Sequence, residues 1–361
     1  MFQETFSLWS YLAGNDKPII LYGMGDGADK IAEVLEMYGL PLSGVCASDS
    51  FVRGQSFRGF TVTTIDDMFA DFPDPIVLLA FGTNKPEVLD DIYELSTQCE
   101  FYVPDLPVVG GGIWNEDYIE RNIRRIERVR GLLADEWSQF LFDCIIDFRL
   151  SGVLDYVRNS YSDKYEMLSL LQLDPDGAES YLDLGAFDGD TVQDFLEMTS
   201  GEFHRITAVE PDMKNFMKLR RRFYQLGLDK FFAFNAAVSD HDGTTDFFAA
   251  GGKHGKISDS GRTREIYCRS ILSLCEDDTP TYIKMDIEGA EEAAILGGAE
   301  LIRNAKPKLM VAVYHRCDDL LRIPELLHDL NPDYKFYLRK TESLPGWDLN
   351  LVAMSSVPDT R

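Results

Sequence analysis

The chain has 361 residues, of which 45% are hydrophobic and 27% are charged, and this composition excludes wholesale disorder. Its length is typical of two domains with connecting structure. Lys and Arg number 35 against 61 Asp and Glu, and the resulting formal net charge of −26 disfavours nucleic acid or an anionic membrane as the main partner.

Three features of the sequence bear on the compartment. No apolar run approaches the roughly 18 residues that a membrane-spanning helix needs, and no basic residue precedes Lys17, which is atypical of a signal peptide. The six cysteines are scattered and never form a C-x-x-C motif, so we interpret them as reduced thiols rather than as disulfides or a structural zinc site. These features predict a cytoplasmic protein without a membrane span.

The first part of the chain predicts a small Rossmann-like domain over residues 1–110. Its glycine loop has the spacing G-x-G-x-G (Gly23, Gly25, Gly27), so we expect a structural turn and no working dinucleotide site. Strands that alternate with helices indicate a parallel sheet, and an α/β pattern of its own predicts that the fragment 1–110 folds by itself. The expected strands are 18–22, 42–46, 61–63, 76–80 and 101–103, with helices at 28–37 and 86–96.

Residues 111–178 predict a helical linker that packs on the next domain. Helical periodicity covers residues 115–133, 135–149 and 152–159. Tyr165, close to the next domain, is expected either to cover a cofactor or to form an aromatic core contact. Four arginines follow one side of the first helix, and we interpret them as a solvated face rather than as an anion site: Arg121, Arg124, Arg125 and Arg128.

Residues 179–361 predict a second, larger α/β domain. Helices are expected between the first five strands, and the last two strands are expected to pair antiparallel. This is the strand count of a class I methyltransferase, a Rossmann-like fold with a seven-stranded sheet. The glycine-rich stretch 251–256 predicts a mobile loop or the turn of an inserted hairpin. The expected strands are 181–184, 205–210, 231–237, 281–286, 308–314, 334–338 and 349–354.

Carboxylates follow two neighbouring strands of this domain. Asp183 ends the first strand, and Gly185 and Gly189 lead into a helix whose free N–H groups can receive an anion. Asp183 would repel a pyrophosphate, whereas S-adenosylmethionine carries an ammonium and a sulfonium together with a carboxylate. Glu210 ends the second strand, where a carboxylate can accept hydrogen bonds from both ribose hydroxyls. The pair predicts S-adenosylmethionine as the cofactor.

From about residue 134 onward, the sequence resembles the FkbM family of methyltransferases. The resemblance is carried by residues 183–191, 208–212, 235–239, 283–291 and 306–315, and the block 283–291 (IKMDIEGAE) is the most specific. It implies methyl transfer from S-adenosylmethionine, with S-adenosylhomocysteine as product, usually to a hydroxyl of a sugar, polyketide or similar small molecule. The resemblance does not extend to residues 1–110.

The candidate site residues follow the strand ends of this domain. His315 follows the fifth strand, and the ordinary pKa of histidine suits a general base beside Asp286 at the acceptor. As an alternative, Asp286, Glu288 and His315 hold a magnesium-like ion that lowers the pKa of the acceptor, although we do not expect a metal. Asn235 and Ala236 end the third strand, where an adenine ring would lie. We assign the cofactor to Asp183, Gly185, Ala186, Asp188, Gly189, Thr191, Glu210, Pro211, Asn235, Ala236 and Asp286.

We therefore predict a cytoplasmic S-adenosylmethionine-dependent O-methyltransferase that acts on a sugar, a glycan or another small molecule. N-methylation and homo-oligomerisation stay open. Two other classes remain as alternatives: a two-domain scaffold or sensor with vestigial nucleotide sites, and an NAD-dependent oxidoreductase that uses the first glycine loop. Intact Asp183, Glu210, Asp286 and His315 disfavour the first alternative, and the incomplete glycine motif disfavours the second.

Overall fold

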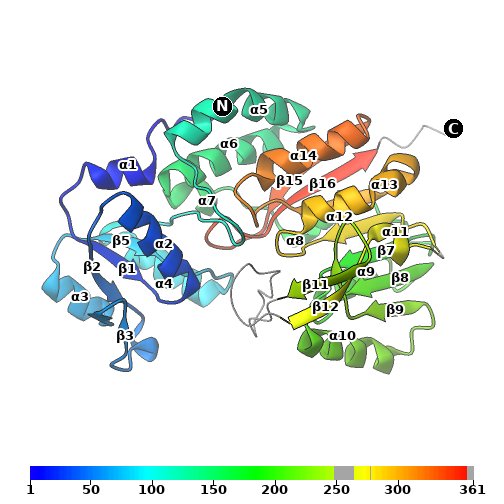
Figure 1. Cartoon of the computed structure of the whole chain (residues 1–361), viewed down its shortest axis with the longest axis horizontal. Coiled ribbons are helices and arrows are strands. Elements are labelled where there is room, and N and C mark those ends of the chain that lie inside the picture. Colours follow the sequence, from blue (N-terminus) through cyan, green and yellow to red (C-terminus); the bar gives the residue numbers. More distant parts are fainter. Residues whose placement is uncertain (248–263, 277, 356–361) are drawn as a thin grey trace.

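The computed structural model describes residues 1–247, 264–276 and 278–355, which form two α/β lobes joined by helices (Figure 1). We retain residues 1–110, 111–178 and 179–361 as the proposed domain boundaries. None of the helices in these described residues is long and apolar enough to cross a membrane.

The N-terminal lobe contains a four-stranded parallel sheet in the order β2-β1-β5-β6. The two central strands are buried along their whole length, as expected for apolar strands that are covered by helices on both faces. The strands are β1 (Ile19–Tyr22), β2 (Leu42–Cys46), β5 (Ile76–Leu79) and β6 (Glu100–Tyr102), and the helices are α2 (Asp26–Met37), α3 (Ile65–Asp71) and α4 (Pro86–Leu95).

The strand expected at residues 61–63 is not part of this sheet. Instead, β4 (Phe60–Thr61) pairs only with β3 (Ser56–Phe57) as a two-stranded hairpin, and a single bridge joins Thr63 to Cys46. The intervening Arg58 and Gly59 both have positive φ, as a tight two-residue hairpin turn requires, so this segment forms a hairpin of its own.

The helical segment lies between the lobes, and a short helix at the N-terminus packs beside it. Asn115 and Asp135 cap the two long helices by accepting backbone N–H groups of the first turn. The arginine face is not simply solvated, because Arg125 forms ion pairs with Asp318 and Glu325 of the C-terminal lobe. The helices are α1 (Leu8–Ala13), α5 (Glu116–Leu132), α6 (Glu136–Ser151), α7 (Asp155–Arg158) and α8 (Lys164–Ser169).

The C-terminal lobe has the expected seven-stranded sheet, in the order β15-β16-β14-β13-β7-β8-β9. Five strands are parallel, and β16 lies antiparallel between β14 and β15, as predicted for the last two strands. The strands are β7 (Ser180–Leu184), β8 (Arg205–Val209), β9 (Phe231–Phe234), β13 (Tyr282–Met285), β14 (Lys308–Ala312), β15 (Tyr334–Lys340) and β16 (Leu349–Ser355). The main helices are α9 (Asp190–Met198), α10 (Met213–Leu226), α12 (Glu291–Gly297), α13 (Ala299–Ala305) and α14 (Asp319–Leu330).

The connection between the third and fourth strands of this sheet differs from the prediction. The strand expected at 231–237 ends at Phe234, because β10 (Ala237–Val238) leaves the large sheet and pairs with β12 (Arg264–Arg269). A small sheet, β10-β12-β11 with β11 at Gly243–Phe247, replaces the expected helix, and only the one-turn α11 (Ile271–Leu274) follows it. The predicted loop at 251–256 lies outside the described residues.

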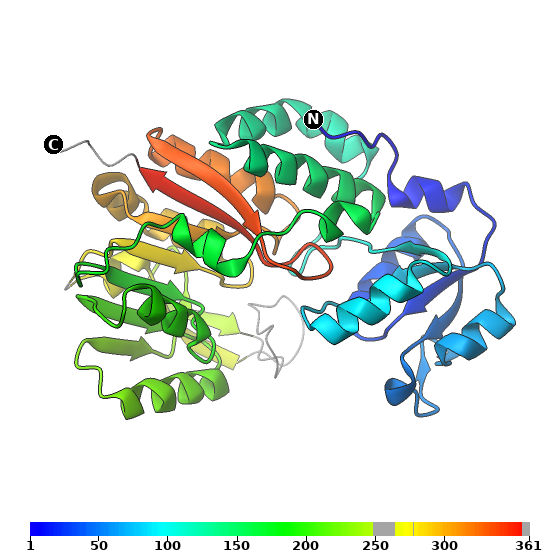
Figure 2. The ribbon, with the colours of Figure 1, turned by 180° about the vertical axis from the view of Figure 1, so that it is seen from behind.

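One of the buried hydrophobic clusters runs through both lobes, whereas a second one is made by residues 8–80 of the N-terminal lobe alone. Val77 and Leu79 of the N-terminal sheet belong to the same buried cluster as Phe148 of α6 and Leu351 of β16. Seen from behind, the turn of the β15–β16 hairpin also extends toward the N-terminal lobe (Figure 2). This shared core argues against the expectation that fragment 1–110 folds alone, because its removal would expose apolar side chains to water.

Candidate active site

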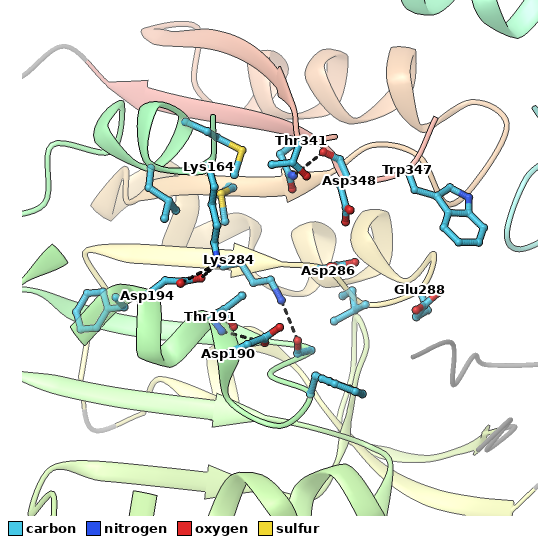
Figure 3. A pocket seen from close by; sticks show the side chains of 18 of the residues that line it. Lys164, Asp190, Thr191, Asp194, Lys284, Asp286, Glu288, Thr341, Trp347 and Asp348 are labelled. Carbon is cyan, nitrogen blue, oxygen red and sulfur yellow. Dashed lines mark hydrogen bonds and ion pairs between the residues drawn. The ribbon is translucent and has the colours of Figure 1, made fainter. Parts of the chain in front are cut away.

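A cavity of about 530 Å³ lies at the carboxyl ends of the parallel strands, where ligands bind in open α/β sheets. Its walls include Gly185 after β7, Glu210 after β8, Asp286 after β13 and Tyr314 after β14. Figure 3 shows Lys284 and Thr191 in the middle of this cavity, with Trp347 at one side and Lys164 at the other. The strand ends therefore bring two of the predicted carboxylates, Glu210 and Asp286, to one space.

Asp183 supports the loop after β7 from beneath the cavity. Its side chain is fully buried, accepts a hydrogen bond from Thr191 Oγ1 at 2.6 Å and lies 3.5 Å from Lys284 Nζ. Lys284 also donates to the carbonyl oxygen of Gly185 at 2.8 Å. Burial raises the pKa of Asp183, and the charge of Lys284 opposes that effect. Asp183 thus stabilises the loop after β7 through Thr191 and Lys284, and it is not among the residues that line the cavity.

The two glycines of this loop allow close packing. Both have positive φ, and a Cβ on Gly185 would lie 1.9 Å from the carbonyl oxygen of Asp286, which a side chain cannot approach. A Cβ on Gly189 would lie 2.3 Å from the ring of Phe223. Gly185 lines the cavity, whereas Gly189 packs against α10.

Glu210 presents a nearly buried carboxylate to the cavity. The backbone N–H of Phe187 donates to Oε2 at 2.9 Å and that of Asp212 donates to Oε1 at 2.8 Å, so both oxygens are fixed in position. Burial raises the pKa of Glu210 to about 7, although the two N–H groups oppose the shift. Each oxygen keeps a second lone pair for a ligand hydroxyl.

The other residues predicted to hold the cofactor divide into two groups. Thr191, Pro211 and Asp286 line the cavity together with Gly185 and Glu210. Asn235 donates from its amide to the carbonyl oxygens of Glu210 and Pro211, and so it shapes this loop from outside the cavity. Six of the predicted cofactor residues do not line the cavity: Asp183, Ala186, Asp188, Gly189, Asn235 and Ala236.

His315 does not sit where a direct base would. Its side chain is 0% exposed and is not among the described residues that line the cavity, whereas the Asp286 side chain is 35% exposed. His315 Nε2 lies 3.3 Å from Asp286 Oδ1, and Nδ1 lies 2.9 Å from Oε1 of the buried Glu291. Burial lowers the pKa of His315, but the flanking carboxylates outweigh it and raise that pKa well above its usual value.

The charge on the His315 ring in turn lowers the pKa of Asp286. Burial raises the pKa of Asp286, but the ion pair with His315 and the charge of Lys284 outweigh burial and leave that pKa far below its ordinary value. Tyr314 Oη also donates to Asp286 Oδ1 at 3.3 Å. Asp286 therefore faces the cavity as a carboxylate, with an imidazolium behind it.

The predicted metal ligands do not share one centre. Glu288 Oε2 lies 3.6 Å from His315 Nε2, but the ligand atoms that lie within 4.8 Å of one another belong to Asp286, Glu291 and His315. Glu291 faces Nδ1 of the ring and Asp286 faces Nε2, so the histidine lies between two carboxylates as an ion pair. Glu288 of the alternative ligand set is therefore not one of the three groups whose ligand atoms lie close together, and those three groups form a buried ion-pair network.

Sequence reasoning missed several lining residues. Lys284 was visible in principle, because a lysine within the apolar strand Tyr282–Met285 signals a buried ion pair. Lys164 lines the cavity and pairs with Asp194, whereas its neighbour Tyr165 is 61% exposed and neither covers the cavity nor packs in the core. No local pattern indicated the residues that come from the other lobe and from the β15–β16 turn: Gly82, Thr83, Asn84, Thr341, Trp347 and Asp348.

Comparison with known proteins agrees with this geometry. Residues 183–335 match the family described as the methyltransferase FkbM domain, and no curated protein matches the chain. The structure is similar to that of methyltransferase FkbM from Methylobacillus flagellatus KT, with a TM-score of 0.73 and 21% identity over 97% of this chain and 94% of that one. This likeness shows the fold over both lobes.

Two further structures match only part of the chain. Precorrin-6y C5,15-methyltransferase from Geobacter metallireducens GS-15 matches with 15% identity and a TM-score of 0.35, over 54% of this chain and 93% of that one. An rRNA methylase from Streptococcus thermophilus matches with 11% identity and a TM-score of 0.35, over 54% of this chain and 94% of that one. The family match covers residues 183–335, on the sheet whose strand ends form the cavity, so this part of the chain is an FkbM methyltransferase domain, which supports a methyltransferase.

Proposed function

We propose that the protein is an S-adenosylmethionine-dependent O-methyltransferase whose acceptor is a small molecule, with a sugar or glycan hydroxyl as the favoured group. The observation that carries the proposal is the placement of Glu210 and Asp286, from two different strand ends, in one cavity. A cytoplasmic location remains part of the proposal.

The residues present fit this cofactor. Glu210 offers two fixed carboxylate oxygens at the strand end where ribose hydroxyls are bound in related folds. The carboxylates of the cavity favour a ligand with positive charge, and S-adenosylmethionine supplies an electrophilic methyl group on a sulfonium. Gly185, Thr191 and Pro211 line the cavity beside Glu210 and would hold the rest of the cofactor.

Asp286 is the residue that we place at the acceptor hydroxyl. As a carboxylate in the cavity, it can accept a hydrogen bond from the attacking hydroxyl and take its proton while the oxygen–methyl bond forms and the methyl–sulfur bond breaks. His315 acts through Asp286, because it is buried behind that carboxylate and holds it ionised. We therefore propose His315 as a positioning residue, in place of the direct base predicted from its sequence position.

Titration calorimetry with S-adenosylhomocysteine tests the cofactor assignment on the full chain. We expect one site per chain, and we expect Glu210→Ala to abolish it because the ribose hydroxyls lose their acceptor. Glu197→Ala, an exposed position on α9, is the matched control and should bind like the wild type. Absence of binding to the wild-type protein would refute the proposal, and equal affinity in Glu210→Ala would refute the role of Glu210.

A further inference from the structure

The N-terminal lobe reaches the cavity through the turn that follows β5. Gly82, Thr83 and Asn84 of this turn line the same space as Asp286 and Glu288. Thus the carboxyl ends of β5 in the N-terminal lobe and of β13 in the C-terminal lobe contribute to one cavity. The sequence had predicted site residues only in the C-terminal lobe. The N-terminal lobe is part of the site wall.

Backbone pairing fixes this turn against the C-terminal lobe. Thr83 N donates to the carbonyl oxygen of Leu344 at 2.9 Å, and Leu344 N donates to that of Thr83 at 2.8 Å. Leu344 belongs to the turn between β15 and β16, residues 341–348, which we name the hairpin loop. Trp347 of the hairpin loop covers Gly82 so closely that a Cβ there would lie 2.1 Å from its ring.

The hairpin loop is itself held in one conformation. Lys340 is buried at its base and donates to the carbonyl oxygens of Ser343 at 2.7 Å and Thr341 at 3.0 Å. Ser343 Oγ donates to the carbonyl oxygen of Trp347 at 2.8 Å. Because hydrogen bonds fix both the turn Gly82–Asn84 and the hairpin loop, these segments lose little conformational entropy when a ligand binds against them.

The charge of the cavity restricts what can enter. The described residues that line it include eight Asp or Glu side chains against two lysines, and Lys164 and Lys284 are each paired with an aspartate. Asp286, Glu288 and Asp348 lie on the side of Trp347 (Figure 3), away from Lys164 and Asp194. An anionic acceptor on that side would meet carboxylates at close range in a partly desolvated space.

We propose that the acceptor lies in the cavity against the wall that the turn Gly82–Asn84 and the hairpin loop form together, and that it is a polar small molecule without negative charge: a neutral polyol or an amine-bearing sugar. Thr83 and Asn84 contact it and determine specificity. Thr83 Oγ1 already accepts from Lys85 N at 3.2 Å, which leaves its hydroxyl proton for the ligand. This inference rests on the proposed function and extends it to the substrate class.

The first experiment determines the charge of the acceptor without its identity. The full chain is incubated with S-adenosylmethionine carrying a tritiated methyl group and with a polar metabolite extract of the source cells. Unreacted S-adenosylmethionine is then removed on charcoal, which adsorbs its adenine ring, and the remaining products are separated on an anion exchanger. We expect labelled product in the unretained fraction. Labelled product in the retained fraction would show an anionic acceptor and overturn the proposed class of uncharged or amine-bearing acceptors. Absence of label from both fractions would also overturn that class. Calorimetry with S-adenosylhomocysteine separates that result from failure of the proposed function, in which the wild type would not bind it.

The second experiment tests the role of the N-terminal lobe. Thr83→Val and Asn84→Ala should each raise the apparent KM for the unretained extract about three- to tenfold, the effect of one lost hydrogen bond. The affinity for S-adenosylhomocysteine should not change. Asn159→Ala, an exposed position in the linker outside the cavity, is the control and should match the wild type. An unchanged KM in both cavity variants would overturn the proposed contact of Thr83 and Asn84 with the acceptor. A loss of affinity for S-adenosylhomocysteine as large as the rise in KM would also overturn it.

Discussion

Nδ1 of His315 lies 2.9 Å from Oε1 of Glu291, and both side chains are 0% exposed. Removing two charges from water is costly unless each finds a partner, and here Glu291 pairs with the imidazolium while its Oε1 also accepts from Ile287 N at 2.9 Å. The opposite edge of the ring faces Asp286. The orientation of the cavity carboxylate therefore depends on a glutamate that never reaches the cavity.

Loss of Glu291 should destabilise the fold. Glu291→Gln keeps the volume and the acceptor for Ile287 N but removes the fully buried carboxylate that pairs with the imidazolium, so we expect the free energy of unfolding to fall by about 3–5 kcal/mol. Urea denaturation measures this change. Glu292→Gln removes the exposed partner of Arg322 in the next position and should cost at most about 1 kcal/mol. Equal effects of the two substitutions would contradict a special role for the buried pair.

Substitution of Asp286 should affect the chemical step. Asp286→Asn removes the ionised acceptor for the attacking hydroxyl, and we expect kcat to fall about 10²–10⁴-fold at saturating S-adenosylmethionine. His315→Asn should lower kcat as well, because Asp286 loses the charge that holds it ionised. Tritium transfer under single-turnover conditions measures both. Full activity in Asp286→Asn would move the acceptor contact to another residue.

Cofactor affinity should depend on pH through Glu210. The pKa of this carboxyl is raised to about 7, and ribose hydroxyls need the ionised form as their acceptor. Protonation below pH 7 therefore weakens binding, and the Kd for S-adenosylhomocysteine should be about tenfold larger at pH 6 than at pH 8. Calorimetry at the two pH values gives the ratio. Glu210→Gln should bind weakly and with a flat pH dependence, and a tenfold ratio in that variant would assign the titration to another group.

The close approach at Gly82 has a measurable cost. A methyl group there would overlap the ring of Trp347, so Gly82→Ala should lower the free energy of unfolding by about 1–3 kcal/mol. A thermal melt of the full chain reports this. Gly111→Ala is the matched control, because a Cβ at that glycine meets nothing within 4 Å. If both variants melt like the wild type, the contact between the lobes is looser than described.

The fragment 1–110 should fail to fold cooperatively by itself. Val77 and Leu79 bury their side chains in the core shared with Phe148, and the backbone N–H groups of Gln3 and Glu4 donate to Asp147 of α6 at 2.7 Å. The fragment lacks all of α6. Differential scanning calorimetry should show no cooperative transition for 1–110, whereas the full chain should give one. A sharp transition in the fragment would restore the view that the lobe is independent.

Local sequence patterns were sufficient to predict the strands of the C-terminal sheet and the carboxylates that follow them. Alternation of buried strands with helices located all seven strands of the C-terminal sheet, and Glu210 and Asp286 follow two of these strands directly. The break after Phe234 was not predictable, because it depends on Ala237 pairing with Cys268 of a distant segment. Propensity cannot distinguish a strand that continues from one that changes sheets.

The environment of His315 also depends on distant residues. Its position after the fifth strand was correct, but its burial results from α12, whose Glu291 packs against the ring. Asn84 and Trp347 reach the cavity only because Thr83 pairs with Leu344, a long-range contact with no sequence signature. Local chemistry therefore predicted the strand-end carboxylates, whereas the wall opposite them required the structure.

The bridge between Thr83 and Leu344 is made entirely by main-chain atoms. Side chains at these positions can change without loss of the two hydrogen bonds. The relative position of the two lobes therefore does not depend on which side chains line the cavity. A library that varies Thr83 and Asn84, with Gly82 kept, would alter the lining of the pocket on an unchanged frame. The same property gives natural selection a route to new acceptors that leaves the methyl donor site intact.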